Sequence, residues 1–286
     1  MRCFFVSDLH GRTDRYEKLF AAVRAEHPGA VFIGGDVLPT GSFVRAALDA
    51  ALDDFVRQYL APAVLALRKD LGPGAPEVFL ILGNDDVRIE EASILDAEAR
   101  GCWQYAHGRK LSLGLHAVYG YACVPPTPFL LKDWERYDVS RYVDPGCVSP
   151  EEGYRSVAVS PDEVKWSTIQ KDLSRLAGDD DLSEAIFLFH SPPHETPLDR
   201  AALDGQTVEG VPLDPHVGSI AIRRFLEERG PRISLHGHIH EAARLTGTWR
   251  TMVGRTHAFT AAHDGPELAL VRFDPQRPED ATRELR

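Results

Sequence analysis

The chain has 286 residues, of which 43% are hydrophobic and 26% are charged, and its formal net charge is −11. Such a negative balance opposes binding to DNA, RNA or an anionic membrane surface, so a nucleic acid polymer is disfavoured as a partner and a small molecule is favoured. No apolar run approaches the roughly 20 residues that a membrane-spanning helix needs.

Cysteine usage predicts a cytoplasmic protein. The four cysteines are Cys3, Cys102, Cys123 and Cys147, and no two of them form a CxxC pair. This pattern fits buried thiols in a reducing compartment better than a disulfide framework or a zinc knuckle. The first apolar run, residues 3–6, is too short for the hydrophobic region of a signal peptide, so none is expected.

Strands and helices are expected to alternate in the first third of the chain. Short apolar runs predict buried strands at residues 2–7, 30–33 and 78–82. Between them, residues 14–26 and 43–69 carry apolar side chains at helical spacing, and Pro62 is expected to kink or divide the longer helix. This β-α-β-α-β order implies parallel strands with helical crossovers, and hence an α/β fold.

The second half of the chain is less regular. Short strands are expected near residues 103–106, 117–122, 185–189, 232–235, 250–253 and 267–273. A helix should begin after Ser160, which can cap it, with Glu163 completing a capping box. Another helix covers about 219–229, and the charged tail after Asp274 is expected to be frayed. Because no linker-like shift in composition occurs, residues 1–286 are predicted to form a single domain.

Two long segments, 125–160 and 191–218, lack a predicted element and flank polar residues considered below. Loops of this length inside a compact domain are usually functional or disordered, so both are interpreted as lids over a substrate. The first loop contains Lys132, Arg136 and Arg141 among aromatic residues, and arginine beside aromatic rings can grip a phosphate and stack a base. For each cation singly, a loop that merely covers the sheet edge is the favoured alternative.

Oxygen and imidazole side chains recur at the ends of the expected strands. They are Asp8, His10, Asp36, Asn84, His190, His238 and His240. Since the carboxyl ends of parallel strands share one edge of an open α/β sheet, the first four should meet at one rim. Carboxylate, amide and imidazole ligands suit transition metals better than calcium. Manganese is the first expectation, and Fe, Zn, Ni and Co are the alternatives. The set suffices for two divalent transition metal ions, which together can clamp a phosphoryl centre.

In chain order these residues form five motifs. They read Asp8-x-His10, Gly35-Asp36, Gly83-Asn84-x-Asp86, His190 and Gly237-His238-x-His240. Over about residues 3–245, the set resembles the calcineurin-like metallophosphoesterase superfamily, whose fold is a sandwich of two mixed β-sheets flanked by α-helices. The resemblance implies that one metal is held by Asp8, His10, Asp36 and His240, and the other by Asp36, Asn84, His190 and His238. It also implies that a hydroxide bridging the two metals attacks phosphorus in line with the leaving group.

One position departs from the pattern of the family. Many members carry histidine as the third residue of the GNxD motif, where it protonates the leaving oxygen, whereas this chain has Asp85. An aspartate beside two cations should have a depressed pKa and stay ionised, which makes it a poor general acid. We therefore expect a phosphodiesterase, with a phosphomonoesterase acting on proteins or nucleotides as the alternative. Asp86 matches the fourth residue of the motif and is expected to orient a ligand.

Other residues are weaker candidates for a catalytic role. His194 could donate the missing proton or contact a phosphate oxygen, and Arg12 could reach a substrate phosphate; the alternative for each is an ordinary loop residue. His216 precedes an expected helix N-terminus that could offer N–H groups to an anion, although most such termini bind only a cap. A non-catalytic scaffold of the same fold ranks below the enzyme, because all seven ligand positions hold residues that can bind metal.

Overall fold

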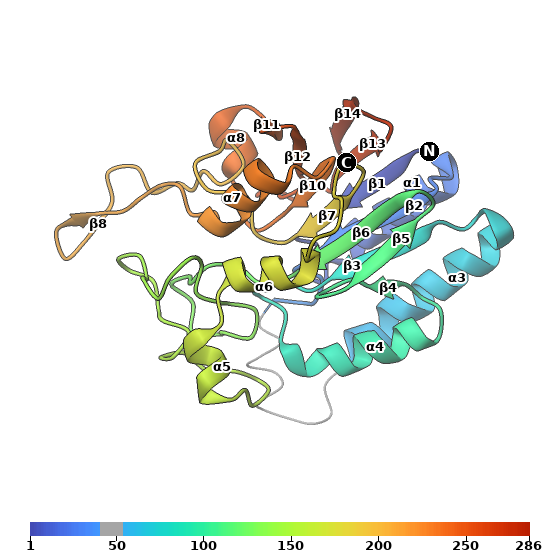
Figure 1. The fold of residues 1–286 in the computed structure, drawn as a ribbon. Coiled ribbons are helices and arrows are strands. Elements are labelled where there is room, and N and C mark those ends of the chain that lie inside the picture. Colours follow the sequence, from blue (N-terminus) through green and yellow to red (C-terminus); the bar gives the residue numbers. More distant parts are fainter. Residues whose placement is uncertain (41–53) are drawn as a thin grey trace.

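Two six-stranded sheets form the centre of the protein (Figure 1). The computed structural model describes residues 1–40 and 54–286. The first sheet contains, in spatial order, β14 (Arg277–Leu285), β13 (Ala269–Asp274), β1 (Cys3–Val6), β2 (Ala30–Gly34), β3 (Glu77–Ile81) and β4 (Gln104–Tyr105). The second contains β11 (Arg250–Val253), β12 (Thr256–Thr260), β10 (Ile233–His236), β7 (Ile186–Phe189), β6 (His116–Tyr121) and β5 (Lys110–Leu113).

Both sheets are mixed, with a parallel centre. In the first, β1, β2, β3 and β4 run parallel, while β13 and β14 are antiparallel additions. In the second, β12, β10, β7 and β6 are parallel, and the edge strands β11 and β5 are antiparallel. The sheets pack on each other through β2 with β7 and β3 with β6. The expected fold class, a sandwich of two mixed sheets between helices, is confirmed.

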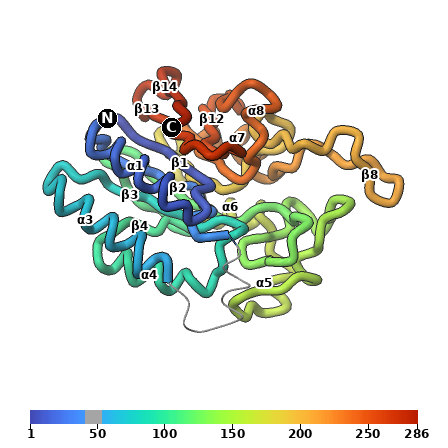
Figure 2. The backbone as a smooth tube through the Cα atoms, turned by 180° about the vertical axis from the view of Figure 1, so that it is seen from behind, coloured from blue at the N-terminus to red at the C-terminus, as the bar shows by residue number. Residues whose placement is uncertain are grey.

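Helices cover the outer faces of the two sheets (Figures 1 and 2). On the first sheet lie α1 (Thr13–Glu26), α3 (Ala61–Leu71) and α4 (Glu91–Ala99), and on the second lie α6 (Ile169–Ala177) and α7 (Ile220–Arg229). Shorter turns of helix are η1 (Val56–Leu60), η2 (Gly72–Gly74), η3 (Arg88–Glu90), α5 (Pro161–Trp166) and α8 (Ala242–Thr246). Within the described residues, each helix is too short or too polar to traverse a bilayer.

The helix predicted over 43–69 is described only in part, because residues 41–53 lie outside the described part of the chain. From Val56 to Leu60 the backbone forms one π-helical turn, and α3 follows directly with Pro62 in its first turn. Proline is tolerated at that position, since its missing N–H would have no partner inside the helix. The backbone is therefore helical without a break from Val56 to Leu71 and changes from π to α just before Pro62, so the described part is not divided there; a kink at Pro62 stays a prediction.

The tail after Asp274 is not frayed, and this prediction was wrong. Residues 277–285 form β14, which pairs with β13 in antiparallel register, for example Val271 with Arg283. Charged side chains are compatible with an edge strand, and here Arg272 on β13 binds Glu284 across the pair at 2.7 Å. Pro278 is tolerated because an edge strand has one side free of ladder hydrogen bonds.

Buried polar contacts fix the loop over residues 125–160, which contains no helix or strand. Lys132 Nζ lies 2.6 Å from Glu135 Oε2, and both side chains are fully buried. The Asp138 carboxylate accepts hydrogen bonds at the start of α7, from Ser219 Oγ and from the N–H groups of Ile220 and Ala221. This loop is therefore bonded to the end of the second long loop.

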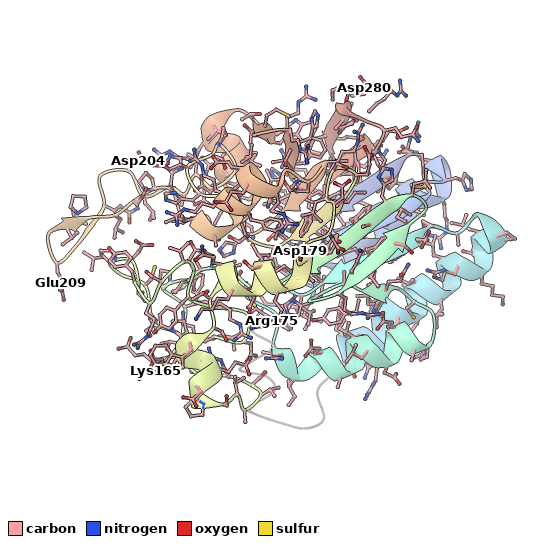
Figure 3. The ribbon with its side chains drawn as sticks, in the orientation of Figure 1. Lys165, Arg175, Asp179, Asp204, Glu209 and Asp280 are labelled. Carbon is pink, nitrogen blue, oxygen red and sulfur yellow. The ribbon has the colours of Figure 1, made fainter. Side chains whose placement is uncertain are left out.

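The loop over residues 191–218 carries a small hairpin of its own. Its strands are β8 (Thr207–Val208) and β9 (Val211–Pro212), and the hairpin projects from the body of the protein (Figure 1). Asp204 and Glu209 lie exposed along this projection (Figure 3). Sequence periodicity predicted neither strand, since two residues are too few to show alternation.

Candidate metal centre

Seven polar side chains follow the carboxyl ends of parallel strands from both sheets. They are Asp8 and His10 after β1, Asp36 after β2, Asn84 after β3, His190 after β7, and His238 and His240 after β10. Two contacts join the sheets here. His190 Nδ1 lies 2.8 Å from Gly34 O, and the His238 N–H donates to Asp8 Oδ1 over 3.0 Å. The edge predicted from the strand ends is therefore one continuous rim.

Asp8, His10, Asp36 and His240 form the first group. Each offers a potential ligand atom, and these atoms all lie within 4.8 Å of one another. His240 Nε2 is 3.2 Å from His10 Nε2 and 3.3 Å from Asp8 Oδ1. Because ligand atoms held about 2 Å from one transition metal ion lie roughly 3–4 Å from each other, this spacing suits a single cation.

Asp36, Asn84, His190 and His238 form the second group. His190 Nε2 lies 3.0 Å from Asn84 Oδ1 and 3.3 Å from Asp36 Oδ2, and the rings of His190 and His238 are 5.2 Å apart. Asp36 Oδ2 also lies 3.9 Å from His10 Nε2, in the first group. The Asp36 carboxylate therefore stands between the two groups, where a ligand shared by two ions has to be.

The unsatisfied polar atoms of this rim fit cations. Asp8 Oδ2 is buried and has no hydrogen-bond partner among the described residues, which is costly for a carboxylate oxygen. His10 Nε2 and His240 Nε2 face each other over 3.2 Å, and each is an acceptor when the proton of its ring is on Nδ1. A divalent ion would satisfy these acceptors together, so the residues present fit the metals that the sequence implies.

The backbone is locally strained at the ligands. Asp8, His10, Asp36 and His238 have φ values of 56°, 49°, 50° and 74°, in a region that non-glycine residues rarely adopt. Each such residue costs on the order of 1–3 kcal/mol, and such outliers persist where the surrounding structure holds them for function. Gly83 is required for a different reason, because a Cβ there would overlap Asp36 and the ring of His190.

Charges of opposite sign shift the pKa values of the ligands. Burial would raise the pKa of Asp36, but the neighbouring His190 and His10 lower it below its ordinary value. Burial would lower the pKa values of His190 and His240, but the carboxylates raise them to about 10 and about 9. His238 differs, since burial and the charge of His190 lower its pKa to about 3. A cation binding His190 or His240 must displace a proton.

Asp86 joins two ligand loops through their backbones. Its buried carboxylate accepts hydrogen bonds of 3.1, 2.8 and 2.8 Å from the N–H groups of Val37, Leu38 and Gly83. These residues adjoin Asp36 and Asn84, so Asp86 acts on the ligands through the main chain. Burial and the charge of Asp36 raise the pKa of Asp86 to about 8, against the effect of the three N–H donors.

Asp85 lies at the mouth of the site, with its side chain 34% exposed. Its Oδ2 is 3.6 Å from His10 Nδ1, and its N–H donates to Asp36 Oδ1 over 2.9 Å. Burial and the charge of Asp36 raise the pKa of Asp85, whereas the sequence led us to expect a depressed value. That expectation included the charge of two cations, and the protein groups alone act in the opposite direction.

The other candidate residues are paired with acidic side chains. Arg12 pairs with Asp14 at 3.1 Å, and His194 Nε2 lies 3.6 Å from Asp214 Oδ2. In the first long loop, acidic partners neutralise Lys132 (Glu135), Arg136 (Glu163) and Arg141 (Glu151). The helix N-terminus after His216 is capped by Asp138, so it does not offer these N–H groups to an anion.

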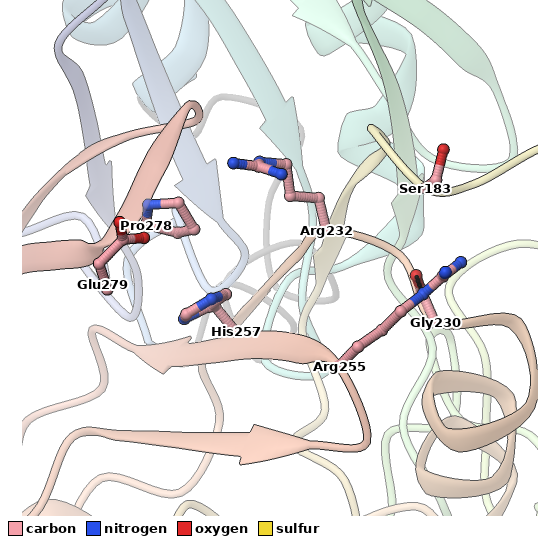
Figure 4. Close-up of a pocket in the computed structure, with 7 residues that line it drawn as sticks. All are labelled: Ser183, Gly230, Arg232, Arg255, His257, Pro278 and Glu279. Carbon is pink, nitrogen blue, oxygen red and sulfur yellow. Dashed lines mark hydrogen bonds between the residues drawn. The ribbon is translucent and has the colours of Figure 1, made fainter.

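A cavity of about 300 Å³ lies at the opposite edge of the second sheet, near the amino ends of β10 and β12 (Figure 4). Its lining comprises Ser183, Gly230, Arg232, Arg255, His257, Pro278 and Glu279. Arg232 donates to the Gln276 carbonyl, and Arg255 donates to the Gly230 carbonyl at the end of α7. Arg232 thus fastens a turn and Arg255 caps the C-terminus of a helix, so structural roles account for both arginines. The cavity contains none of the proposed metal ligands.

Sequence reasoning missed Asp199, which is fully buried in the second long loop and lies 2.8 Å from His216 Nδ1. No local signal marks it, because a lone aspartate in a loop reads as a solvated charge. Its burial depends on the folding of the loop around it.

Comparison with known proteins identifies the family. The family model described as calcineurin-like phosphoesterase matches residues 1–242. A search of curated proteins found no match.

Among solved structures, TT1561 of Thermus thermophilus is similar at a TM-score of 0.56 and 14% identity, covering 99% of this chain and 98% of its own. A dimetal phosphatase from Danio rerio is similar at a TM-score of 0.53 and 14% identity, covering 95% and 91%. Phosphopantetheinyl hydrolase from Mycobacterium tuberculosis is similar at 0.50 and 12%, covering 91% and 89%. At these identities the likeness concerns the fold, and the family match carries the assignment: the chain belongs to the calcineurin-like phosphoesterases.

Proposed function

We propose that this protein hydrolyses a phosphodiester of a small molecule, using two divalent transition metal ions, with manganese as the first choice. The observation that carries the proposal is the position of Asp36 between two groups of ligands, within 3.9 Å of His10 and 3.3 Å of His190. Two cations, when bound there, would supply the nucleophile by lowering the pKa of a water and would offset charge on the phosphoryl group.

The proposed ligand sets follow the two groups. Asp8, His10, Asp36 and His240 would hold one ion, and Asp36, Asn84, His190 and His238 would hold the other. Mixed carboxylate, amide and imidazole ligands support a transition metal over calcium or magnesium. Asp86 would keep the loops of Asp36 and Asn84 at a fixed spacing through its three backbone contacts.

The choice of a diester rests on Asp85. Its carboxyl occupies the mouth of the site, and two cations nearby would favour its ionised form. An ionised carboxylate there repels a monoester dianion more strongly than a diester, which carries one negative charge. It also supplies no proton to the leaving group, so another group has to supply one where the leaving group is poor.

Two substrates separate the diesterase from the alternative phosphomonoesterase. With metal-loaded protein, we expect faster hydrolysis of bis-(p-nitrophenyl) phosphate than of p-nitrophenyl phosphate, and a clear preference for the monoester would overturn the diester assignment. Asp85→His should raise the monoesterase rate, because it places a proton donor at the mouth. Asp36→Asn and His238→Ala should abolish turnover while the far-ultraviolet circular dichroism spectrum is unchanged.

The scaffold alternative predicts no metal. Elemental analysis of the purified protein, before and after incubation with Mn²⁺, distinguishes the two: we expect close to two ions per chain, and none acquired would favour a scaffold. The single domain over 1–286 and the cytoplasmic location stay predictions. Limited proteolysis that releases two stable fragments would contradict the former.

A further inference from the structure

The carboxylate of Asp199 is fully buried and orients one imidazole. It accepts three main-chain hydrogen bonds, from the N–H groups of Glu195, Thr196 and Gly218 at 2.9, 2.9 and 3.1 Å. His216 Nδ1 lies 2.8 Å from its Oδ1. Since an ionised carboxylate can only accept, Nδ1 must carry the proton of this hydrogen bond, and the ring is held in one orientation.

Nε2 of His216 is available to a ligand. The His216 side chain is 31% exposed, and its Nε2 makes no hydrogen bond with any residue that the structure describes. The nearest ring is that of His194, with centroids 6.2 Å apart, and His194 faces Asp214 at 3.6 Å. His236 differs, because both of its ring nitrogens are engaged, with Ser191 O and Ser234 Oγ.

His216 belongs to the loop that leaves the edge of the second sheet where the ligands after β7 and β10 lie. It lies in the crossover from β7 to α7, which leaves the carboxyl end of β7, and β7 is parallel to β10. Its neighbour Val217 packs in the apolar cluster that contains Ile239, the residue between His238 and His240. A hydrogen bond also joins the long loop that contains His216 to the turn after β10. In it, the Ala202 N–H donates to Glu241, the residue after His240, over 3.0 Å.

We propose that His216 donates the proton that the leaving group needs, and that Asp199 is the positioning residue that aims it; this rests on the proposed function. As the oxygen of water forms its bond to phosphorus and that water releases one proton to the solvent, the bond from phosphorus to the leaving oxygen breaks, and the leaving oxygen takes the electron pair. The proton on His216 Nε2 passes to the same oxygen, which leaves as an alcohol. His216 becomes neutral, keeps its Nδ1–H on Asp199, and regains a proton from water.

The test is the dependence of turnover on the leaving group. The substrates are 4-nitrophenyl methyl phosphate, whose leaving group needs no proton, and phenyl methyl phosphate, whose leaving group does. In metal-loaded protein, His216→Gln should lower kcat on the phenyl ester by about 100-fold or more and kcat on the nitrophenyl ester by less than about fivefold. Imidazole added to His216→Gly should restore part of the rate on the phenyl ester alone.

The controls separate this role from others. His257→Gln, at the opposite edge of the second sheet, should leave both rates unchanged. Asp199→Asn should lower the rate on the phenyl ester as well. If that variant does not fold, His216→Gln, which changes a side chain that is 31% exposed, still tests the proposed proton donor. Equal losses on both esters, no loss on either, or a selective loss in His194→Gln in place of His216→Gln would overturn the assignment. If wild-type, metal-loaded protein cleaves neither ester, the proposed function itself fails.

Discussion

Replacement of Asp86 by alanine should lower the free energy of unfolding by at least about 3 kcal/mol. Three buried N–H groups, of Val37, Leu38 and Gly83, donate to this carboxyl. Each donor left without an acceptor costs about 1–3 kcal/mol, so the losses together reach at least the figure given. Asp86→Asn keeps one oxygen, which can accept two of the three bonds, so its loss should be about 1–3 kcal/mol.

The measurement is urea unfolding of chelator-treated protein, followed by circular dichroism. Asp96→Ala is the matched control, because its exposed carboxyl makes one 3.9 Å contact with Arg100, and its effect should stay below about 0.5 kcal/mol. The reasoning is refuted if Asp86→Ala unfolds within about 1 kcal/mol of wild type, since the three N–H groups would then have found other acceptors.

The effect of pH on Asp86 has a definite sign. Because folding raises the pKa of this carboxyl from 3.8 to about 8, its protonated form is favoured in the folded state. Its contribution to stability is complete below pH 3.8 and is lost as pH rises through about 8. The stability advantage of wild type over Asp86→Asn should therefore narrow between pH 5 and pH 8, and an advantage that widens would contradict the assigned shift.

Three further changes should act on the metals or the loops. Metal affinity should rise with pH between about 6 and 8, since His190 and His240, with pKa values of about 10 and about 9, must lose protons; competition with a chromophoric chelator measures this, and a flat profile would contradict it. Lys132→Met should lower the free energy of chemical unfolding by about 3–5 kcal/mol, because it leaves the buried Glu135 carboxylate without its cation; a decrease below about 1 kcal/mol would contradict this prediction. Gly83→Ala should reduce bound metal in elemental analysis, because its Cβ would overlap Asp36; full occupancy would count against that overlap.

The ligand rim could be predicted because its signals are local. Buried parallel strands read as short apolar runs, and the polar residue that ends each run lies at the carboxyl edge by topology. The strands β1, β2 and β3 follow the predicted runs closely, and Asp36 and Asn84 come two and three residues after the ends of β2 and β3. The pairing of the two sheets was not deducible from these runs, and it entered through the family resemblance.

Other features depended on tertiary contacts. The segment 91–99 forms α4 although its apolar residues show little helical periodicity. The helix packs on the protein through Ser93, Ile94 and Ala97, and two of these three buried residues are too small or polar to stand out in an apolar pattern. The Ser160 cap exists, with Oγ accepting from the Glu163 N–H at 3.1 Å, but the Glu163 side chain binds Arg136 instead of closing a capping box. Asp138 gained its role only when the two long loops met, and Asp199 only when the second loop folded around it.

The two ends of the ligand set are far apart along the chain. His10 and His240, whose ring nitrogens lie 3.2 Å apart, are separated by 230 positions. During synthesis, a nascent chain that has exposed only β1 to β4 presents Asp8, His10, Asp36 and Asn84 without the histidines of the second sheet, and binds a cation weakly. Capture of the ions has to wait until residue 240 has cleared the ribosome and the second sheet has docked. Cells that make this protein would therefore load it after translation, and a truncation before β10 would yield a protein unable to retain its ions.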